Sequence, residues 1–348
     1  MFSAARTVLR QAIDDRAFPA ASIEVGDATQ PLWQESFGRL TFDPGASPAT
    51  ERTIFDLASL TKVMATTPLL MQQVERGSIG LDDAVIDHIA GWRSPDRVLV
   101  TLRDLLTHSS GLPAYRELFR NHRGRIAFEQ AICQTPLEYA PRSASIYSDL
   151  GFILLGFMLE AESPLHTRFE TLLGQMEIVE DLQFNPPVEW RPRTAPTELD
   201  AWRGRLIVGE VHDENAWALG GAAGHAGLFG TAAGVGAYGR HLLQVLDRRT
   251  GAFQRATLET FIARGTDIPG SSRALGWDTM LATSSCGSRM SPRAFGHTGY
   301  TGTSLWIDPD RGIYVVLLTN RVHPTRENDA IKRVRPAVHD AIMGEIGR

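Results

Sequence analysis

Two β-type runs near each end of the chain enclose a long helical middle. Near the start these runs are "AASIEVGD" and "PLWQESFGRL", which have the lengths and residue types of a hairpin. Near the end the pattern returns in "SLWIDPDRGIYVVLLTNRV", where Asp308-Pro309-Asp310 and Arg311-Gly312 supply the turn. We therefore expect strands from both ends of the chain to form one antiparallel sheet flanked by helices.

Apolar residues at helical spacing occupy most of the middle of the chain. The predicted helices there are Ser59–Arg76, Leu102–Thr107, Arg125–Cys133, Asp149–Glu160 and Thr231–Leu246, with outer helices at 2–16 and 328–346. An irregular connection is expected at 185–200, which is rich in proline and polar residues. The predicted fold is α/β (α+β): a sheet-and-helix lobe from residues 1–75 and 255–348, a mostly helical lobe from 76–254, and a cleft between them that would hold the site.

Charge and cysteine content exclude several classes of protein. The net charge is −5, from 40 acidic and 35 basic residues spread along the chain, and no basic block is present to neutralise phosphates. We therefore expect no nucleic-acid partner. Cys133 and Cys286 are too few for a disulfide scaffold; one bridge is conceivable, but free thiols are favoured. No metal site and no cofactor are predicted.

Neither apolar stretch of the chain predicts a membrane segment or a leader. The window from Ala218 to Gly239 is weakly charged, but its glycines and His225 favour a Gly-rich loop that leads into a helix. The first 18 residues alternate apolar and charged positions and lack the apolar core of a signal peptide. As written, the sequence predicts a cytoplasmic protein, or a periplasmic or secreted one if a leader has been removed.

The stretch "ASLTKVM" places a serine and a lysine three residues apart. On a helix Ser59 and Lys62 would lie on one face, within hydrogen-bond reach. A neutral lysine in a desolvated pocket can take the proton of a serine hydroxyl. A chance match of this motif is common, but the chain has only two lysines, Lys62 and Lys332. Because arginine cannot give up its proton, a lysine here favours a catalytic pair.

Two later segments carry further polar residues next to predicted elements. Tyr147-Ser148-Asp149 comes directly before an apolar helix, where Asp149 is able to act as the N-cap. His297-Thr298-Gly299 stands where a β-strand begins, and its glycine permits close approach of a ligand. Taken alone, Tyr147 would equally suit a core aromatic position.

With these residues the sequence resembles the serine β-lactamase and penicillin-binding protein superfamily, in particular the branch with class C β-lactamases, D-alanyl-D-alanine carboxypeptidases and esterases. The resemblance covers nearly the whole chain. It rests on three short motifs in order: SxxK at Ser59 to Lys62, Tyr-x-Asn at Tyr147 to Asp149, and Lys/His-Thr-Gly at His297 to Gly299. Each motif is weak alone, but their order and context are jointly specific.

The resemblance implies a role for each motif residue. Ser59 would be acylated, Lys62 would help to remove its proton, and Tyr147 would pass that proton to the leaving group. The backbone N–H groups of Ser59 and Tyr300 would form an oxyanion hole, which is typically worth about 3 to 4 kcal/mol to the transition state. Substrate would be bound by the remaining motif residues and by a histidine of the Gly-rich loop, namely Asp149, His297, Thr298, Gly299 and His225.

Two residues depart from the commoner pattern of the family. Asp149 replaces asparagine, and its carboxylate would favour the charged form of Lys62 and leave more of the proton transfer to Tyr147. His297 stands where many relatives have lysine, and with a reference pKa of about 6.5 it would be mostly neutral at pH 7. If it anchors a substrate carboxylate, acylation should fall as pH rises through its titration.

Several other residues are weaker candidates. A functional role for His225 is as plausible as a structural one. His108, near a helix end, is interpreted as structural and outside the site. His212 and Asp213 could suggest a metal, but without a third ligand a surface turn is favoured. Pro68 is expected to kink the helix that begins at Ser59.

The sequence thus predicts a metal-independent serine hydrolase that acts through a Ser59 acyl-enzyme on D-amino-acid peptides, β-lactams or small esters. A carboxypeptidase-like or esterase-like enzyme is favoured over an efficient β-lactamase. The alternative is a penicillin-binding sensor or scaffold of the same fold that does not turn over. The expected partners are a small-molecule or peptide substrate, with β-lactams as possible covalent ligands.

Overall fold

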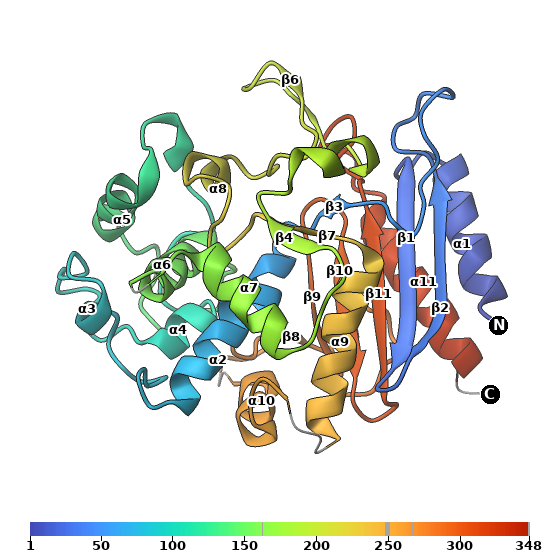
Figure 1. The fold of residues 1–348 in the computed structure, drawn as a ribbon. Helices are drawn as coiled ribbons and strands as arrows, with labels where there is room; N and C mark the ends of the chain where they lie inside the picture. The colour runs from blue at the N-terminus through green and yellow to red at the C-terminus, as the bar shows by residue number, and fades with distance from the viewer. Residues whose placement is uncertain (162, 248–250, 266–267, 347–348) are drawn as a thin grey trace.

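One antiparallel sheet of six strands organises the computed structural model, which describes residues 1–161, 163–247, 251–265 and 268–346. Its strand order is β2-β1-β11-β10-β9-β8 (Figure 1). The strands are β1 (Ala20–Asp27), β2 (Pro31–Gly38), β8 (Asp278–Thr279), β9 (Phe295–Thr298), β10 (Ser304–Asp308) and β11 (Ile313–Thr319). The N-terminal hairpin pairs with the C-terminal one through β1 and β11, from Ala21 opposite Thr319 to Asp27 opposite Ile313. The predicted sheet is therefore confirmed.

Helices cover both faces of this sheet. α1 (Ser3–Asp14) and α11 (Ile331–Ile346) pack together on one face, and α9 (Ala232–Leu246) lies on the other (Figure 1). Alternation along β11 shows the two layers. Val315 and Leu317 belong to the core on the α1 and α11 side, whereas Val316 and Leu318 belong to the core on the α9 side. Because side chains of a strand alternate between faces, a strand such as β11, which is apolar up to its last residue, is buried on both faces.

The second part of the molecule is mostly helical (Figure 1). It contains α2 (Thr67–Glu75), α3 (Val85–His88), α4 (Leu102–Leu106), α5 (Gly124–Gln134), α6 (Asp149–Leu159), α7 (Leu165–Gln175) and α8 (Glu214–Ala218), and α10 (Arg255–Ile262) lies beside α2 and α9. Short 3-10 turns occur at Leu118–Arg120 and Val188–Arg193. Two further sheets are small. One has three strands in the order β3-β7-β4, namely β3 (Phe55–Asp56), β7 (Leu228–Gly230) and β4 (Leu182–Phe184). The other pairs β5 (Leu199–Asp200) with β6 (Arg205–Leu206).

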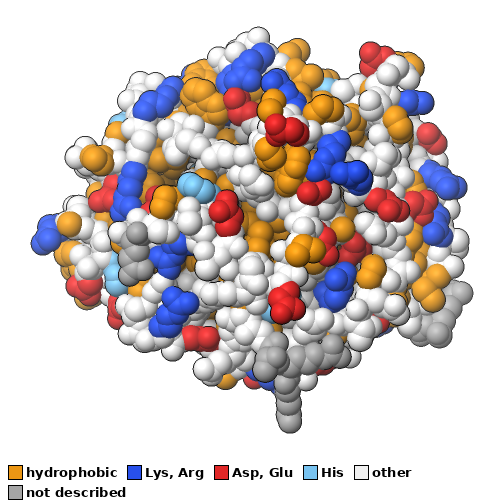
Figure 2. Space-filling view, in the orientation of Figure 1, with side chains coloured by type: hydrophobic (Ala, Val, Ile, Leu, Met, Phe, Trp, Pro, Cys, Tyr) orange, Lys and Arg blue, Asp and Glu red, His pale blue; other side chains and the backbone are white. Residues whose placement is uncertain are grey.

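Most predicted helices are found within a few residues of their expected ends. The division into lobes of 1–75 with 255–348 and of 76–254 stays a prediction, and α9, inside the second range, packs on the large sheet. Cys133 and Cys286 are both free and buried. No described helix is long and apolar enough to cross a membrane. Charged side chains of both signs are scattered over the face shown in Figure 2.

The helix predicted from Ser59 to Arg76 is instead built in two parts. Lys62–Thr66 forms a π-helical turn, in which the Thr67 N–H donates to the Lys62 carbonyl, and α2 follows with Pro68 in its first turn. A carbonyl in a π-turn bonds the N–H five residues later, and for Val63 that residue is Pro68, which has no N–H. The Tyr238 hydroxyl donates to the Val63 carbonyl instead, at 2.7 Å. The proline therefore ends the π-turn and begins a new helix.

Candidate active site

Ser59 and Lys62 lie in contact at the start of this helix. The Lys62 side chain is fully buried, whereas Ser59 is partly exposed. Lys62 Nζ donates to Ser59 Oγ at 2.9 Å, to Asp149 Oδ1 at 2.7 Å and to the His225 carbonyl at 3.0 Å. An ammonium has three N–H donors, and here each has an acceptor. The i, i+3 spacing thus places the serine and lysine together, and Asp149 completes the group.

The charge of Lys62 is set by two opposing effects. Burial, the larger single effect, lowers the pKa of Lys62, but the Asp149 carboxylate and the Tyr147 phenol together raise it above 10.5. Lys62 is therefore a charged ammonium at neutral pH, paired with a carboxylate. This is the effect predicted for aspartate at position 149.

Contrary to the N-cap prediction, Asp149 does not cap its helix. Ser148 occupies the N-cap position of α6, without a side-chain cap, and Asp149 is the first helical residue. Its carboxylate turns to Lys62, and its N–H donates to the Ala114 carbonyl at 3.0 Å. A carboxylate in the first turn is still favoured by the helix dipole. The N-cap prediction was wrong because a buried ammonium is a stronger partner than the helix N–H groups.

The Tyr147 ring lies close to both Lys62 and His297. Its ring centroid is 4.9 Å from Lys62 Nζ and 5.8 Å from the His297 ring. Burial raises the pKa of Tyr147 above 10, and the neighbouring Lys62 ammonium offsets only part of this rise. The phenol is therefore neutral in the resting protein.

His297 is a neutral histidine at the end of the large sheet. Burial, together with the charges of Arg273 and Lys62, holds its pKa well below 6.5. Its Nδ1 lies 2.8 Å from the Thr298 carbonyl, so this nitrogen carries the proton and Nε2 is an acceptor. The titration expected near neutral pH therefore falls in the acid range, because burial and the neighbouring positive charges disfavour the charged form of the ring.

The turn after His297 is fastened to the segment that carries Ser59. The Thr301 and Thr303 hydroxyls donate to the carbonyls of Asp56 and Leu57 at 2.7 and 3.0 Å. A Cβ on Gly299 would lie 2.4 Å from the Leu57 carbonyl oxygen, so only glycine fits this contact. These bonds hold the 299–303 turn beside residues 56–58.

The two predicted oxyanion donors lie on these joined segments. The Gly299 carbonyl accepts from the Gly302 N–H at 3.0 Å, which fixes the peptide whose N–H belongs to Tyr300. Within the described ranges, the N–H groups of Ser59 and Tyr300 donate to no protein acceptor. Tyr300 itself is half exposed and stacks on the Arg321 guanidinium.

His225 touches the site through its backbone. Its carbonyl accepts from Lys62, while its Nε2 lies 2.8 Å from Asp213 Oδ1. Asp213 also caps α8 through the Ala216 N–H at 2.7 Å. The His225 ring therefore anchors the Gly-rich loop, and the loop presents a carbonyl to Lys62.

The surface turn predicted at His212 and Asp213 is not observed. His212 is buried, its Nε2 lies 2.9 Å from Glu198 Oε2, and its N–H donates to Asp56 Oδ2 at 2.7 Å. The acid partners lie 14 and 156 residues earlier in the chain, so no local pattern signals this burial. Among the described residues, no three His, Cys, Asp or Glu side chains are grouped to hold a metal.

The Gly-rich loop packs against α6 without space for a side chain. A Cβ on Gly224 would lie 2.1 Å from the Phe152 carbonyl oxygen. We expect Gly224→Ala to lower the free energy of unfolding by about 3 kcal/mol, near the upper end for overpacking. Denaturant unfolding measures this change. The control is Gly174→Ala in α7, where nothing lies within 4 Å and alanine should stabilise by about 0.5 to 1 kcal/mol; equal effects of the two changes would contradict the packing argument.

Sequence reasoning missed two residues that contact Tyr147. The centroid of the His108 ring lies 4.6 Å from that of the Tyr147 ring. The Arg273 guanidinium lies 5.1 Å from the centroid of the Tyr147 ring and also forms an ion pair with Asp278. Arginine is frequent throughout the chain, so Arg273 carried no distinguishing signal. The position of His108 after a short helix indicates only a structural role, and its contact with the Tyr147 segment comes from a partner 40 residues away.

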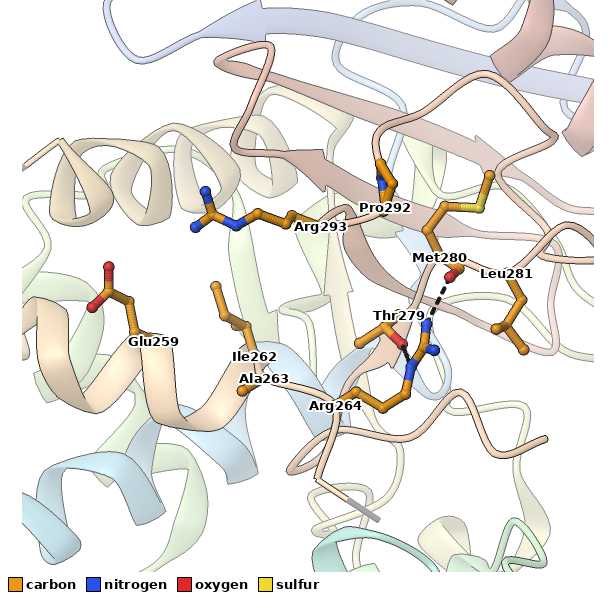
Figure 3. A pocket seen from close by; sticks show the side chains of 9 residues that line it. All are labelled: Glu259, Ile262, Ala263, Arg264, Thr279, Met280, Leu281, Pro292 and Arg293. Atoms are coloured by element: carbon orange, nitrogen blue, oxygen red, sulfur yellow. Dashed lines mark hydrogen bonds between the residues drawn. The ribbon is translucent and has the colours of Figure 1, made fainter. Parts of the chain in front are cut away.

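A separate hollow of about 510 Å³ lies between α10 and the strand edge at β8. Figure 3 shows Arg264 reaching across it, with bonds to the Thr279 hydroxyl at 2.9 Å and the Met280 carbonyl at 2.8 Å. Its lining residues do not include Ser59 or Lys62. This hollow is therefore distinct from the candidate site.

Comparison with known proteins identifies the family. The family model described as Beta-lactamase matches residues 5–339. A Salmonella typhi protein named "Putative D-alanyl-D-alanine carboxypeptidase" is 32% identical over 320 residues, which cover 81% of this chain and 73% of the relative. Two solved structures share the fold: EstCE1, a hydrolase with promiscuous acyltransferase activity (TM-score 0.77, 22% identity, 98% and 97% of the two chains), and the octameric penicillin-binding protein homologue from Pyrococcus abyssi (TM-score 0.77, 19% identity, 98% and 77%). The chain belongs to the β-lactamase family.

Proposed function

We propose that the protein is a serine hydrolase that forms an acyl-enzyme at Ser59. The observation that carries this proposal is the hydrogen bond of 2.9 Å between Lys62 Nζ and Ser59 Oγ. It joins a partly exposed hydroxyl to a buried lysine, which can receive the hydroxyl proton once it has lost one of its own. The predicted oxyanion donors, Ser59 N–H and Tyr300 N–H, lie on segments tied together by hydrogen bonds.

The reaction would proceed in two steps, starting from the form in which Lys62 has released one proton to solvent. Ser59 Oγ attacks the substrate carbonyl, its proton passes to the neutral Lys62 amine directly or through Tyr147, and the oxyanion is stabilised by the two backbone N–H groups. The bond to the leaving group then breaks as Tyr147 gives its proton to that group and takes up the proton held by Lys62. In the second step water attacks the acyl-enzyme, and Ser59 regains its proton as the acid is released.

The resting charges indicate how the proton moves. Lys62 is charged and Tyr147 is neutral, so neither is a free base before substrate arrives. Once Lys62 has lost one proton, its two remaining N–H groups can still bond Asp149 and the His225 carbonyl, and its lone pair can face Ser59. Asp149 thus organises the amine in both states.

We infer a carboxypeptidase-like or esterase-like activity on D-amino-acid peptides, β-lactams or small esters. The Salmonella relatives carry a carboxypeptidase name, and the EstCE1 title describes a hydrolase with acyltransferase activity. A neutral His297 can offer a substrate only hydrogen bonds, so the charge partner of a substrate carboxylate would be an arginine, either Arg273 beside Tyr147 or Arg321 beside Tyr300. The affinity for a substrate that carries a carboxylate should then stay constant between pH 6 and 8.

A paired assay tests this proposal against a sensor that binds penicillin without turnover. The protein and Ser59→Ala are each incubated with a p-nitrophenyl ester and with a fluorescent penicillin. We expect ester turnover by the wild-type protein and its loss, with loss of labelling, in Ser59→Ala. Stable labelling without ester turnover would favour the sensor. Activity that survives in Ser59→Ala would remove Ser59 from the mechanism.

A further inference from the structure

His108 is joined to both neighbours of Tyr147. Its carbonyl accepts from the Ile146 N–H at 2.9 Å, and its ring Nδ1 accepts from the Ser148 N–H at 3.0 Å. The ring centroids of His108 and Tyr147 are 4.6 Å apart. His108 also holds a left-handed backbone conformation, with φ at 57°, which is uncommon for a residue other than glycine. His108, in an uncommon backbone conformation, thus makes three contacts with residues 146–148, the segment that carries the phenol.

The bond to Ser148 requires one particular form of the His108 ring. An N–H can be accepted only by a nitrogen that carries a lone pair, so Nδ1 is unprotonated and Nε2 carries the hydrogen. Burial, with the nearby charges of Arg273 and Lys62, holds the pKa of His108 well below 6.5 and keeps the ring neutral. A protonated ring would have no acceptor for Ser148.

The same stretch of chain anchors the rest of the Tyr147 segment. The Ser145 hydroxyl donates to the Thr107 carbonyl at 2.9 Å, and the Ser148 hydroxyl donates to the Pro113 carbonyl at 2.7 Å. An apolar side chain could fill the space between Tyr147 and Phe152, but it would leave the buried Ser148 N–H without an acceptor.

We propose that His108 is the positioning residue of Tyr147: its Nδ1 and carbonyl fix the backbone from Ile146 to Ser148, and thereby hold the phenol beside Lys62 and Ser59. This inference rests on the proposed function, in which Tyr147 moves the proton. His108 is not a catalytic residue, since it acts through Tyr147.

Two amide substitutions separate the nitrogens of this ring. Asparagine places its Oδ1 near the position of Nδ1 and tolerates the left-handed conformation, whereas glutamine reaches the position of Nε2. We expect His108→Gln and His108→Ala to lower kcat for a p-nitrophenyl ester about 100-fold, because a shift of about 1 Å at a catalytic group can cost that much. His108→Asn should recover at least about tenfold of this loss, with KM changed about threefold or less in each variant.

The outcomes separate this inference from the proposed function. Melting curves show which variants are folded, and only those are compared. If His108→Ala fails to fold, the difference in kcat between His108→Asn and His108→Gln decides whether His108 has the positioning role. Equal kcat in His108→Asn and His108→Gln, or full activity in His108→Gln, would overturn the positioning role. Ser59→Ala and Tyr147→Phe are measured beside them. If Tyr147→Phe retains full kcat, the proposed proton path fails and the His108 inference falls with it. If it loses kcat, a failure among the His108 variants concerns His108 alone.

Discussion

Lys62→Met is expected to lower kcat/KM for an activated ester about 10³- to 10⁴-fold, within the upper range for loss of a general acid–base group. Methionine has a similar volume but can neither accept the Ser59 proton nor bond Asp149. Steady-state hydrolysis measures the loss, and circular dichroism checks the fold, since removing one partner of a buried ion pair also destabilises.

The chain offers a matched control for this substitution. Lys332 is the only other lysine, and it is exposed on a surface pair with Asp329. Lys332→Met should leave kcat/KM unchanged. A folded Lys62→Met protein that keeps more than about a tenth of wild-type activity would contradict the assignment of Lys62 as the base or its organiser.

Asp149→Asn is expected to move the rising limb of the pH–rate profile to lower pH by about one unit or more. In the native site, Asp149 holds the pKa of Lys62 above 10.5 against the effect of burial. Without the carboxylate, burial dominates and the pKa of Lys62 falls. A base acts only when unprotonated, so the rate rises with pH through its pKa, and a lower pKa places that rise at lower pH.

The profile of kcat/KM against pH measures this shift. Asp82→Asn is the control, because Asp82 is a largely exposed carboxylate paired with Arg103 on the surface. It should leave the profile in place. If Asp149→Asn also leaves the limb where it was, Lys62 is not the group whose deprotonation limits acylation, and the base is to be sought at Tyr147.

Local patterns in the sequence predicted most of the fold. The residue types of the end strands and their turn signals placed these strands in one sheet, and the i, i+3 spacing placed Ser59 beside Lys62. Both are properties of short segments, which the residue order specifies directly. The prediction failed where a partner came from far along the chain. Tyr238 satisfies the Val63 carbonyl that Pro68 cannot, and the predicted helix is instead a π-turn followed by α2.

The candidate site shows the same division. The motifs marked Tyr147, Asp149 and His297, and the structure brings these residues together around Lys62, while their catalytic roles stay predictions. The burial of His212 could not be predicted, because its partner Glu198 is set by tertiary packing and not by a local pattern. The interaction of Asp149 with Lys62 was predicted from the resemblance, whereas the N-cap of the helix is Ser148 and not Asp149.

The mass of the protein, quenched with acid during turnover of a p-nitrophenyl ester, tests the central claim most directly. If Ser59 is the nucleophile, one acyl group should appear on the intact chain, map to the peptide that contains Ser59, and be absent from Ser59→Ala. An acyl group mapped to a different residue, or one that forms equally in Ser59→Ala, would contradict the acyl-enzyme at Ser59.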